Sequence, residues 1–294
     1  MKRILIIILA LLIVSPLAFA GKRAFLVGVS KYKAEWNSIH GSEDVDSLIE
    51  PELKKQGFQV TTLTDKQATR RGIINGLNDL INNKIKRGDI VYIHFSTHGQ
   101  PVEDGMNGYP REESDGWDES IVPYDAGSQY SKNGYDGSKH ITDDELKDYV
   151  ALIRTKIGPK GALYVVMDAC HAGSLSKDGF ETTRGTNEGL TRDKNNVFKF
   201  SKAENKQHYS LESGSKLAPT LFLEACTSRE RNSEISVKGK EYGSLSYMVY
   251  LTLKNKKIGS VPADFEKAII NTVANSGLWP RDQHMVTETS YKTK

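Results

Sequence analysis

The fold is decided by the stretch Ala162-Leu-Tyr-Val-Val-Met-Asp168-Ala-Cys170-His171-Ala-Gly173-Ser174. It is a continuous apolar run that ends in a polar turn, a pattern typical of a buried parallel strand. In open α/β sheets, functional residues lie at the carboxyl ends of such strands. This end carries an Asp, a Cys and a His, so we expect the chemistry of the protein to be here.

A second stretch has the same form. The apolar run from Asp89 to Phe95 is followed by Ser96-Thr-His98-Gly99. If the two strands are neighbours, Cys170 and His98 lie side by side, as a thiol nucleophile and its base require. His171 is the competing base, but adjacent residues that leave a strand tend to point to opposite sides.

Two other interpretations of these residues stay open at this point. Cys170 could be a small buried hydrophobic residue, as many cysteines without a disulfide are. A metal site could be built from His98, Cys170, His171 and Cys226, although their spacing matches no common zinc pattern.

The rest of the chain alternates between strand and helix patterns. Apolar runs predict strands at 24–29, 58–63 and 221–226, with helical periodicity between them and at 244–253 and 262–273. Pro51 is expected to kink or end the first helix. This alternation predicts one α/β domain at 21–294, with a mainly parallel sheet and helices on both faces. Two regions lack a pattern: an acidic loop at 100–140 and a flexible basic linker at 175–216.

The first twenty residues have the form of a secretory signal peptide. Lys2 and Arg3 precede an apolar run from Ile4 to Val14, and Ala18-Phe19-Ala20 follows. The run is shorter than the roughly 20 residues that span a bilayer. We therefore expect cleavage after Ala20, export to the periplasm or the medium, and no stable membrane anchor afterwards.

Composition excludes some classes of function. The formal net charge is +3, and no block of basic residues interleaves with aromatic ones, so we expect no nucleic-acid partner. The only two cysteines, Cys170 and Cys226, cannot build a disulfide scaffold of the small secreted kind. They could form one bridge, which would silence Cys170, or remain thiols.

The two strand-end motifs together carry a family resemblance. Ser96-Thr-His98-Gly99 and Asp168-Ala-Cys170-His171-Ala-Gly173-Ser174 resemble the histidine and cysteine motifs of metacaspases, which are caspase-like cysteine peptidases. The resemblance runs from Arg23 to about Leu253. Further matching segments are Gly41–Asp44, Asp115–Asp125, Ile141–Leu146 and Gly243–Tyr247. The resemblance implies a caspase-like three-layer α/β sandwich and hydrolysis of peptide bonds, with no cofactor required for the chemistry.

The resemblance also implies roles for single residues. Cys170 would be the nucleophile, His98 the general base and acid, and the backbone N–H groups of Gly99 and Cys170 would hold the oxyanion. Substrates would be peptides or proteins with Arg or Lys before the scissile bond, bound by Asp44, Ser96 and Asp168. Asp44 could instead serve a helix N-terminus, and Asp168 could be a structural carboxylate.

Calcium and self-cleavage are further expectations. Asp118, Asp143 and Asp144 match three of the four calcium-binding aspartates of relatives, whereas the fourth position holds Lys177, with Asp178 one step later. Asp143 and Asp144 would equally suit the N-terminus of a helix. The linker carries basic residues that would suit self-cleavage, or that simply face solvent: Lys177, Arg184, Arg192, Lys194, Lys199, Lys202, Lys206 and Lys216.

Two other functions remain open from the sequence. One is a catalytically quiet binding or regulatory protein that keeps the caspase fold. The other is a peptidase of the clostripain or legumain type, which would share the Cys–His dyad.

Overall fold

The computed structural model describes residues 20–111, 113, 115–169, 182–186, 188–198, 211–227 and 230–291. The expectations for the signal peptide, Cys170, His171, Lys177 and Asp178 lie outside the described residues.

A six-stranded sheet forms the centre of the molecule, with the strand order β11-β8-β7-β3-β1-β2. Five of these strands are parallel, and β11 pairs antiparallel with β8 at one edge. The strands are β1 (Lys22–Gly28), β2 (Gln59–Thr64), β3 (Ile90–Ser96), β7 (Ala162–Asp168), β8 (Thr220–Glu224) and β11 (Val286–Thr289). The mainly parallel sheet is as predicted.

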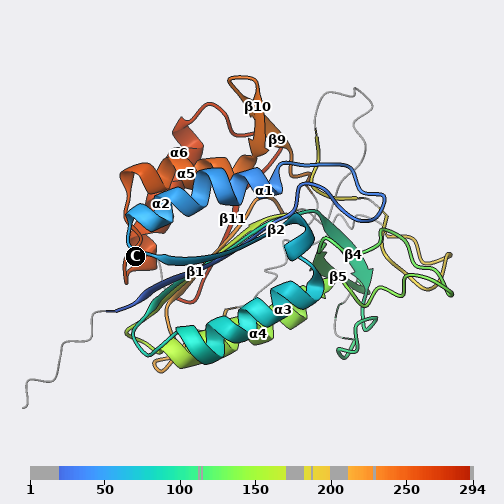
Figure 1. The fold of residues 1–294 in the computed structure, drawn as a ribbon, viewed down its shortest axis with the longest axis horizontal. Helices are drawn as coiled ribbons and strands as arrows, with labels where there is room; N and C mark the ends of the chain where they lie inside the picture. Colours follow the sequence, from blue (N-terminus) through green and yellow to red (C-terminus); the bar gives the residue numbers. More distant parts are fainter. Residues whose placement is uncertain are drawn as a thin grey trace, which may run out of the picture.

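Helices cover both faces of this sheet, with α3 and α4 on one face and α1, α2, α5 and α6 on the opposite face (Figure 1). The helical elements are α1 (Gly41–Glu43), the π-helical η1 (Asp44–Ile49), α2 (Glu50–Lys55), η2 (Asp65–Gln67), α3 (Arg70–Asp79), η3 (Leu80–Lys84), α4 (Asp143–Ile157), α5 (Ser244–Asn255) and α6 (Pro262–Asn275).

Two apolar cores explain why the strands are apolar at every position. In β1, Phe25 and Val27 belong to the core beneath α3 and α4, while Ala24 and Leu26 belong to the core beneath α5 and α6. A strand that is buried on both faces has no position for a polar residue, so its sequence cannot alternate.

The first helical segment begins beside the end of β3 and includes Asp44, one of the predicted substrate-binding residues. Its helical turns run on from Gly41 through Pro51 to Lys55, so Pro51 does not end the helix. Pro51 lies directly after the π-helical turn Asp44–Ile49, where the regular α-helical hydrogen-bond pattern is already interrupted. A Cβ on Gly41 would lie 2.1 Å from the Ser96 carbonyl oxygen, so only glycine lets the helix approach the end of β3 this closely.

The region predicted to be an irregular acidic loop contains regular structure. The strands β4 (Gly99–Glu103), β5 (Trp117–Ile121) and β6 (Ile141–Thr142) form a three-stranded antiparallel sheet. A hairpin, β9 (Glu234–Val237) and β10 (Lys240–Gly243), follows β8 in the chain. The polar composition of β5 concealed a strand, because Asp118 and Ser120 are buried there alongside the apolar Trp117 and Ile121.

Within the described part of the chain, no helix has the length and apolar character needed to cross a membrane.

Candidate active site

The two motif-bearing strands are neighbours, as expected. β3 and β7 pair in parallel with Ser96 opposite Asp168. His98 and Cys170 each follow this pair by two residues, so the register sends both to the same edge of the sheet. Cys170 itself lies outside the described residues.

His98 is buried and its ring is held in one orientation. Its Nε2–H donates to the backbone oxygen of Asn37 at 2.8 Å. Its Nδ1 has no hydrogen-bond partner among the described residues. A neutral imidazole with the proton on Nε2 leaves Nδ1 as an acceptor, which is the arrangement of a general base.

Aromatic residues pack around this imidazole. Trp36 stacks on the His98 ring, with ring centroids 5.2 Å apart, and the Tyr32 ring lies at 5.1 Å. The Tyr32 hydroxyl also accepts a hydrogen bond from the backbone N–H of His98 at 2.7 Å. Burial lowers the pKa of His98 to about 4, although the bond to Asn37 acts in the opposite direction. His98 is therefore neutral at pH 7.

A buried pocket beside His98 holds a positive charge. The guanidinium of Arg184 is inaccessible to solvent, and its Nη2 lies 2.7 Å from Asp44 Oδ2 and 2.6 Å from Glu234 Oε1. Its Nη1 donates to the Ser96 hydroxyl, which in turn donates to Asp44 at 2.7 Å. Asp44 and Ser96, both predicted from the sequence, are thus brought together around a basic side chain.

Glu234 is a pocket residue that the sequence did not reveal. Its second carboxylate oxygen accepts from Nδ1 of His40 at 2.8 Å, and the His40 backbone N–H donates to its first. Burial opposes ionisation of Glu234, but Arg184 and His40 outweigh it and lower the pKa. Glu234 sits in a hairpin with no motif, so no sequence signal could have found it.

The pKa of Asp44 shifts in the opposite direction to that of Glu234. Burial raises its pKa to about 7, the Arg184 guanidinium opposes this, and the Asp168 and Glu234 carboxylates add to it. Asp44 accepts from Arg184, Ser96 and the Gly243 backbone N–H, which together favour the ionised form while the guanidinium is present. The pocket therefore favours a cation as its occupant.

Asp168 contributes to the pocket differently from the prediction. Its carboxylate accepts from Asn232 Nδ2 at 2.6 Å and from the Ser246 N–H and hydroxyl at 2.7 and 2.6 Å. Arg184 reaches only its backbone oxygen, at 3.4 Å. The Asp168 carboxylate therefore organises the pocket wall and adds negative charge without touching the guanidinium.

Gly243 completes the pocket by lacking a side chain. A Cβ there would lie 2.2 Å from Asp168 Oδ2, 2.7 Å from Asp44 Oδ2 and 2.8 Å from Arg184 Cζ. Any other residue would fill the space that the guanidinium occupies.

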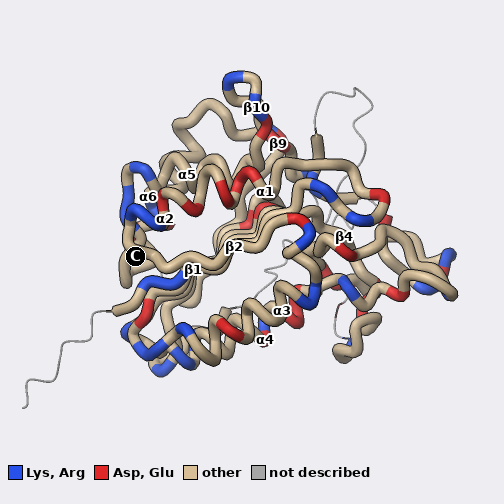
Figure 2. The backbone as a smooth tube through the Cα atoms, in the orientation of Figure 1, with Lys and Arg blue, Asp and Glu red and all other residues tan. Residues whose placement is uncertain are grey.

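The predicted calcium ligands lie in an acidic region around β4 and β5. Asp and Glu gather along the α1 and β4 side of the molecule (Figure 2). Burial, together with the nearby carboxylates of Asp143 and Asp104, raises the pKa of Asp118 to about 8. Lys147 lies 2.9 Å from Asp143 and 3.0 Å from Asp144, and so neutralises part of this charge.

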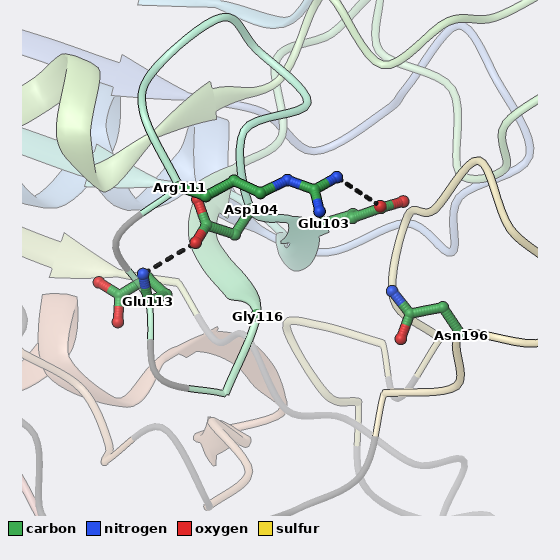
Figure 3. A pocket seen from close by; sticks show the side chains of 6 residues that line it. All are labelled: Glu103, Asp104, Arg111, Glu113, Gly116 and Asn196. Carbon is green, nitrogen blue, oxygen red and sulfur yellow. Dashed lines mark hydrogen bonds and ion pairs between the residues drawn. The ribbon is translucent and has the colours of Figure 1, made fainter.

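These carboxylates do not by themselves make a metal site. Among the residues that the structure describes, no three His, Cys, Asp or Glu side chains are placed to hold a metal ion. Asp178 lies outside the described residues. An acidic pocket of about 290 Å³ borders this region (Figure 3); it is lined by Glu103, Asp104, Arg111, Glu113, Gly116 and Asn196. In it, Arg111 pairs with Glu103, and Asp104 accepts from the Glu113 N–H.

Cys226 is buried just after β8. A bridge between Cys226 and Cys170 concerns a residue outside the described part of the chain and stays a prediction.

Comparison with known proteins agrees with this geometry. The profile of the metacaspase, peptidase C14 domain matches residues 22–177, just over half of the chain. The chain is 24% identical over 275 residues to Metacaspase-1 of Lodderomyces elongisporus, which covers 80% of this chain and 58% of that relative. The chain spans about half the length, or less, of the curated relatives it matches.

Two solved structures share the fold. A protein from Geobacter sulfurreducens superposes with a TM-score of 0.59 at 20% identity, covering 93% of this chain and 95% of that one. Caspase-1 from Spodoptera frugiperda superposes with a TM-score of 0.52 at 11% identity, covering 92% of this chain and 86% of that one. The prediction of a caspase-like α/β sandwich is thereby confirmed.

The burial of His98 predicts its titration. The unfolded chain protonates this histidine near pH 6.5, whereas the folded chain does so only near pH 4. Between these values the unfolded state binds more protons, so His98 lowers the free energy of unfolding as the pH falls, by about 1.4 kcal/mol per pH unit. Nuclear magnetic resonance of the ring protons should show a midpoint near pH 4, with the signal identified by its loss in His98→Gln. A midpoint near pH 6.5 would contradict this assignment.

Proposed function

Because the chain belongs to the metacaspase family of cysteine peptidases, we propose that it is an endopeptidase that cleaves peptides and proteins after Arg or Lys. One observation carries the specificity: a fully buried guanidinium held by Asp44 and Glu234 at the sheet edge that also carries His98. A pocket that stabilises Arg184 in this way would stabilise the same side chain of a substrate.

The geometry around His98 supports its role as the base. Nδ1 of the neutral ring accepts the proton of the Cys170 thiol, and the thiolate attacks the substrate carbonyl carbon. The bond from Nε2–H to Asn37 keeps the ring in this tautomer and stabilises the imidazolium that forms. The imidazolium then protonates the leaving amine, and a water molecule hydrolyses the thioester to restore the thiol.

The backbone N–H of Gly99 would donate to the oxyanion. Gly99 begins β4 directly after His98, so the base and this donor are fixed by the same turn. A donor aimed at the developing negative charge stabilises the transition state more than the substrate.

The pocket favours Arg over Lys and rejects Asp. Both carboxylates contact the same guanidinium nitrogen, Nη2. A lysine side chain is one atom shorter, so its ammonium nitrogen would not reach the position of Nη2, where the two acids meet. An aspartate side chain would meet two like charges in a dry site.

Peptides that end in Arg, Lys or Asp before a fluorogenic group test this specificity. We expect cleavage in the order Arg, then Lys, with none after Asp, and no activity in Cys170→Ala. Glu234→Gln should lower kcat/KM for the Arg peptide by about 10- to 100-fold, because a charged partner of the guanidinium is lost. Cleavage after Asp would contradict the pocket assignment, and no cleavage at all would favour a catalytically quiet caspase-fold protein.

Calcium activation is a second part of the proposal. It is supported by the closeness of three predicted ligands: the carboxylates of Asp143 and Asp144 add to the effect of burial in raising the pKa of Asp118. Hard oxygen ligands of this kind suit calcium. Calcium titrated into the Cys170→Ala protein in a calorimeter should bind, and Asp118→Asn should weaken binding by about tenfold or more. Glu241→Gln, on the distant β10, should have no effect. Equal binding by wild type and Asp118→Asn would refute a role for this region.

Export with cleavage after Ala20 is the third part. The Gly21 nitrogen lies 2.7 Å from Asp89 Oδ1, and Asp89 is buried. Cleavage would turn this nitrogen into an ammonium group, and the hydrogen bond into an ion pair at the start of β1.

We therefore expect the ion pair between the mature N-terminus and Asp89 to contribute to the free energy of unfolding. In protein that begins at Gly21, Asp89→Asn should lower the free energy of unfolding by about 1.5–3 kcal/mol, as measured in urea. The loss should be smaller when Phe19 and Ala20 remain, because the nitrogen is then an uncharged amide. Mass spectrometry of protein recovered from the producing cells should find Gly21 first, and retention of residues 1–20 would show this proposal to be wrong.

A further inference from the structure

The turns at the amino ends of the parallel strands form a basic face, called here the amino-end face. It consists of residues 84–88 before β3, residues 154–161 before β7, residues 254–259 after α5, and the start of β1. Each of the three turns contains three basic residues and no acidic one. Figure 2 shows Lys and Arg gathered at the end of the molecule where β1 begins. This face lies at the edge of the sheet opposite to His98, which follows the carboxyl end of β3.

Hydrogen bonds hold these turns against one another. The Gly88 N–H donates to the Ile157 oxygen at 2.8 Å, which joins the turn before β3 to the end of α4. Lys22 Nζ donates to the Ile258 oxygen at 3.2 Å, which joins the start of β1 to the turn after α5. The amino-end face is therefore a fixed surface whose charges keep their relative positions.

Four cations of this face have exposed side chains: Lys86, Arg87, Lys160 and Lys257. Each lies two or three residues beyond the end of η3, α4 or α5. A cation in the last turn of a helix compensates the helix dipole, but this effect fades outside that turn. Within the described part of the chain, none of the four forms an ion pair. Their charges therefore face solvent without a structural role that accounts for them.

The cations of this face are also close to one another. Burial lowers the pKa of Lys22, and the positive charge of Lys257 lowers it further. A Cβ on Gly158 would lie 3.2 Å from Arg87 Cζ, so this guanidinium lies over the turn that contains Lys160. Like charges that are held together in this way are stabilised by an anionic partner that contacts several of them at once.

An acidic residue at the same edge does not cancel this charge. The Asp89 carboxylate is buried, and it accepts from the backbone N–H groups of Gly21 and Lys86 at 2.7 and 3.0 Å. It therefore serves the backbone beneath the face and leaves the exposed ammonium and guanidinium groups unpaired.

The position of the N-terminus favours a membrane as the partner. β1 begins at Lys22, so residues 1–20, with the apolar run from Ile4 to Val14, join the domain at the amino-end face. During the proposed export this run would be in the membrane, with the face next to the lipid headgroups. Clusters of roughly four to eight Lys or Arg next to a membrane segment are typical of binding to anionic lipids.

We propose that the amino-end face binds the anionic headgroups of a phospholipid bilayer through Lys86, Arg87, Lys160 and Lys257, and does so after residues 1–20 are removed. The contact is electrostatic and reversible, so it adds no anchor to the mature chain. Strands of seven residues, about 20 Å long, separate this face from the edge that holds His98, so the bound protein would present its site to the solvent. The inference does not depend on peptide hydrolysis.

Vesicle binding by the chain that begins at Gly21 tests the proposal. We expect it to sediment with vesicles of phosphatidylcholine and about one quarter phosphatidylglycerol, and not with phosphatidylcholine alone. Replacement of Lys86, Arg87, Lys160 and Lys257 by Gln should weaken the binding at least about 100-fold, since each basic residue near the surface contributes about fivefold. Binding should be lost in about 0.5 M salt, which screens exposed charges.

A control variant removes the same number of charges from other faces. It replaces Lys132, Lys194, Lys240 and Arg281 by Gln, all of which have exposed side chains. This variant has the same net charge as the first one, and it should bind the anionic vesicles within about fivefold of wild type, because the cations removed would not face the bilayer.

Circular dichroism of both variants checks that they fold. If the variant with four changes in the amino-end face does not fold, Lys86→Gln with Arg87→Gln replaces it, with an expected loss of about 25-fold. Cleavage of an Arg peptide by the folded variant should equal that of wild type, because the changes lie at the opposite edge of the sheet.

The outcomes separate this inference from the proposed function. Equal weakening in the two variants would refute it, because net charge alone would then explain the binding. Equal binding of wild type to neutral and anionic vesicles would refute it too, as would binding to a short DNA duplex without binding to vesicles. A protein that binds the anionic vesicles through this face but cleaves no peptide would support this inference and refute the proposed peptidase.

Discussion

A dehydrated cluster of charges is the constraint on which the site depends. Asp44, Glu234 and Arg184 have side chains that are fully removed from solvent. Moving charges out of water costs several kcal/mol per ion unless partners and hydrogen bonds compensate. Here the compensation comes from Ser96, the Gly243 N–H and His40, which belong to separate parts of the chain. Loss of the Arg184 charge would leave the Asp44 carboxylate buried without its positively charged partner.

The charges of this cluster also act on His98, the proposed general base. Arg184 lowers the pKa of His98 and Glu234 raises it, both acting in addition to the larger effect of burial. The occupant of the pocket therefore influences how readily His98 accepts a proton. In the proposed function, binding of a basic side chain would therefore act on the pKa of the proposed general base.

The sequence was most informative where burial was most complete. The apolar runs predicted β1, β3, β7 and β8 to within two or three residues, because a strand buried on both faces needs an apolar residue at every position. The adjacency of β3 and β7 followed from their motifs, and it brings Ser96 beside Asp168.

The rest depended on tertiary contacts that leave no local pattern. Glu234 and Gly243 enter the pocket from a hairpin, and Asn37 serves His98 through a backbone atom that any residue could supply. Trp117-Asp-Glu-Ser-Ile121 forms a strand in which three of the five residues are polar, so its composition indicated a loop. Arg184 was one of eight basic linker residues, and only the folded pocket distinguishes it from the others.

The pairing of β7 with β8 would hold the two parts of the chain together if the linker between them were broken. The linker joins these two strands, yet they are neighbours in the sheet, with Leu163 opposite Thr220 and Met167 opposite Glu224. A break in the linker would convert an intramolecular pairing into the association of two polypeptides that share one sheet and the apolar core beneath α5 and α6. The protein would then behave as a split protein, in which stability rises with concentration and the unfolded fragments no longer benefit from a covalent tether.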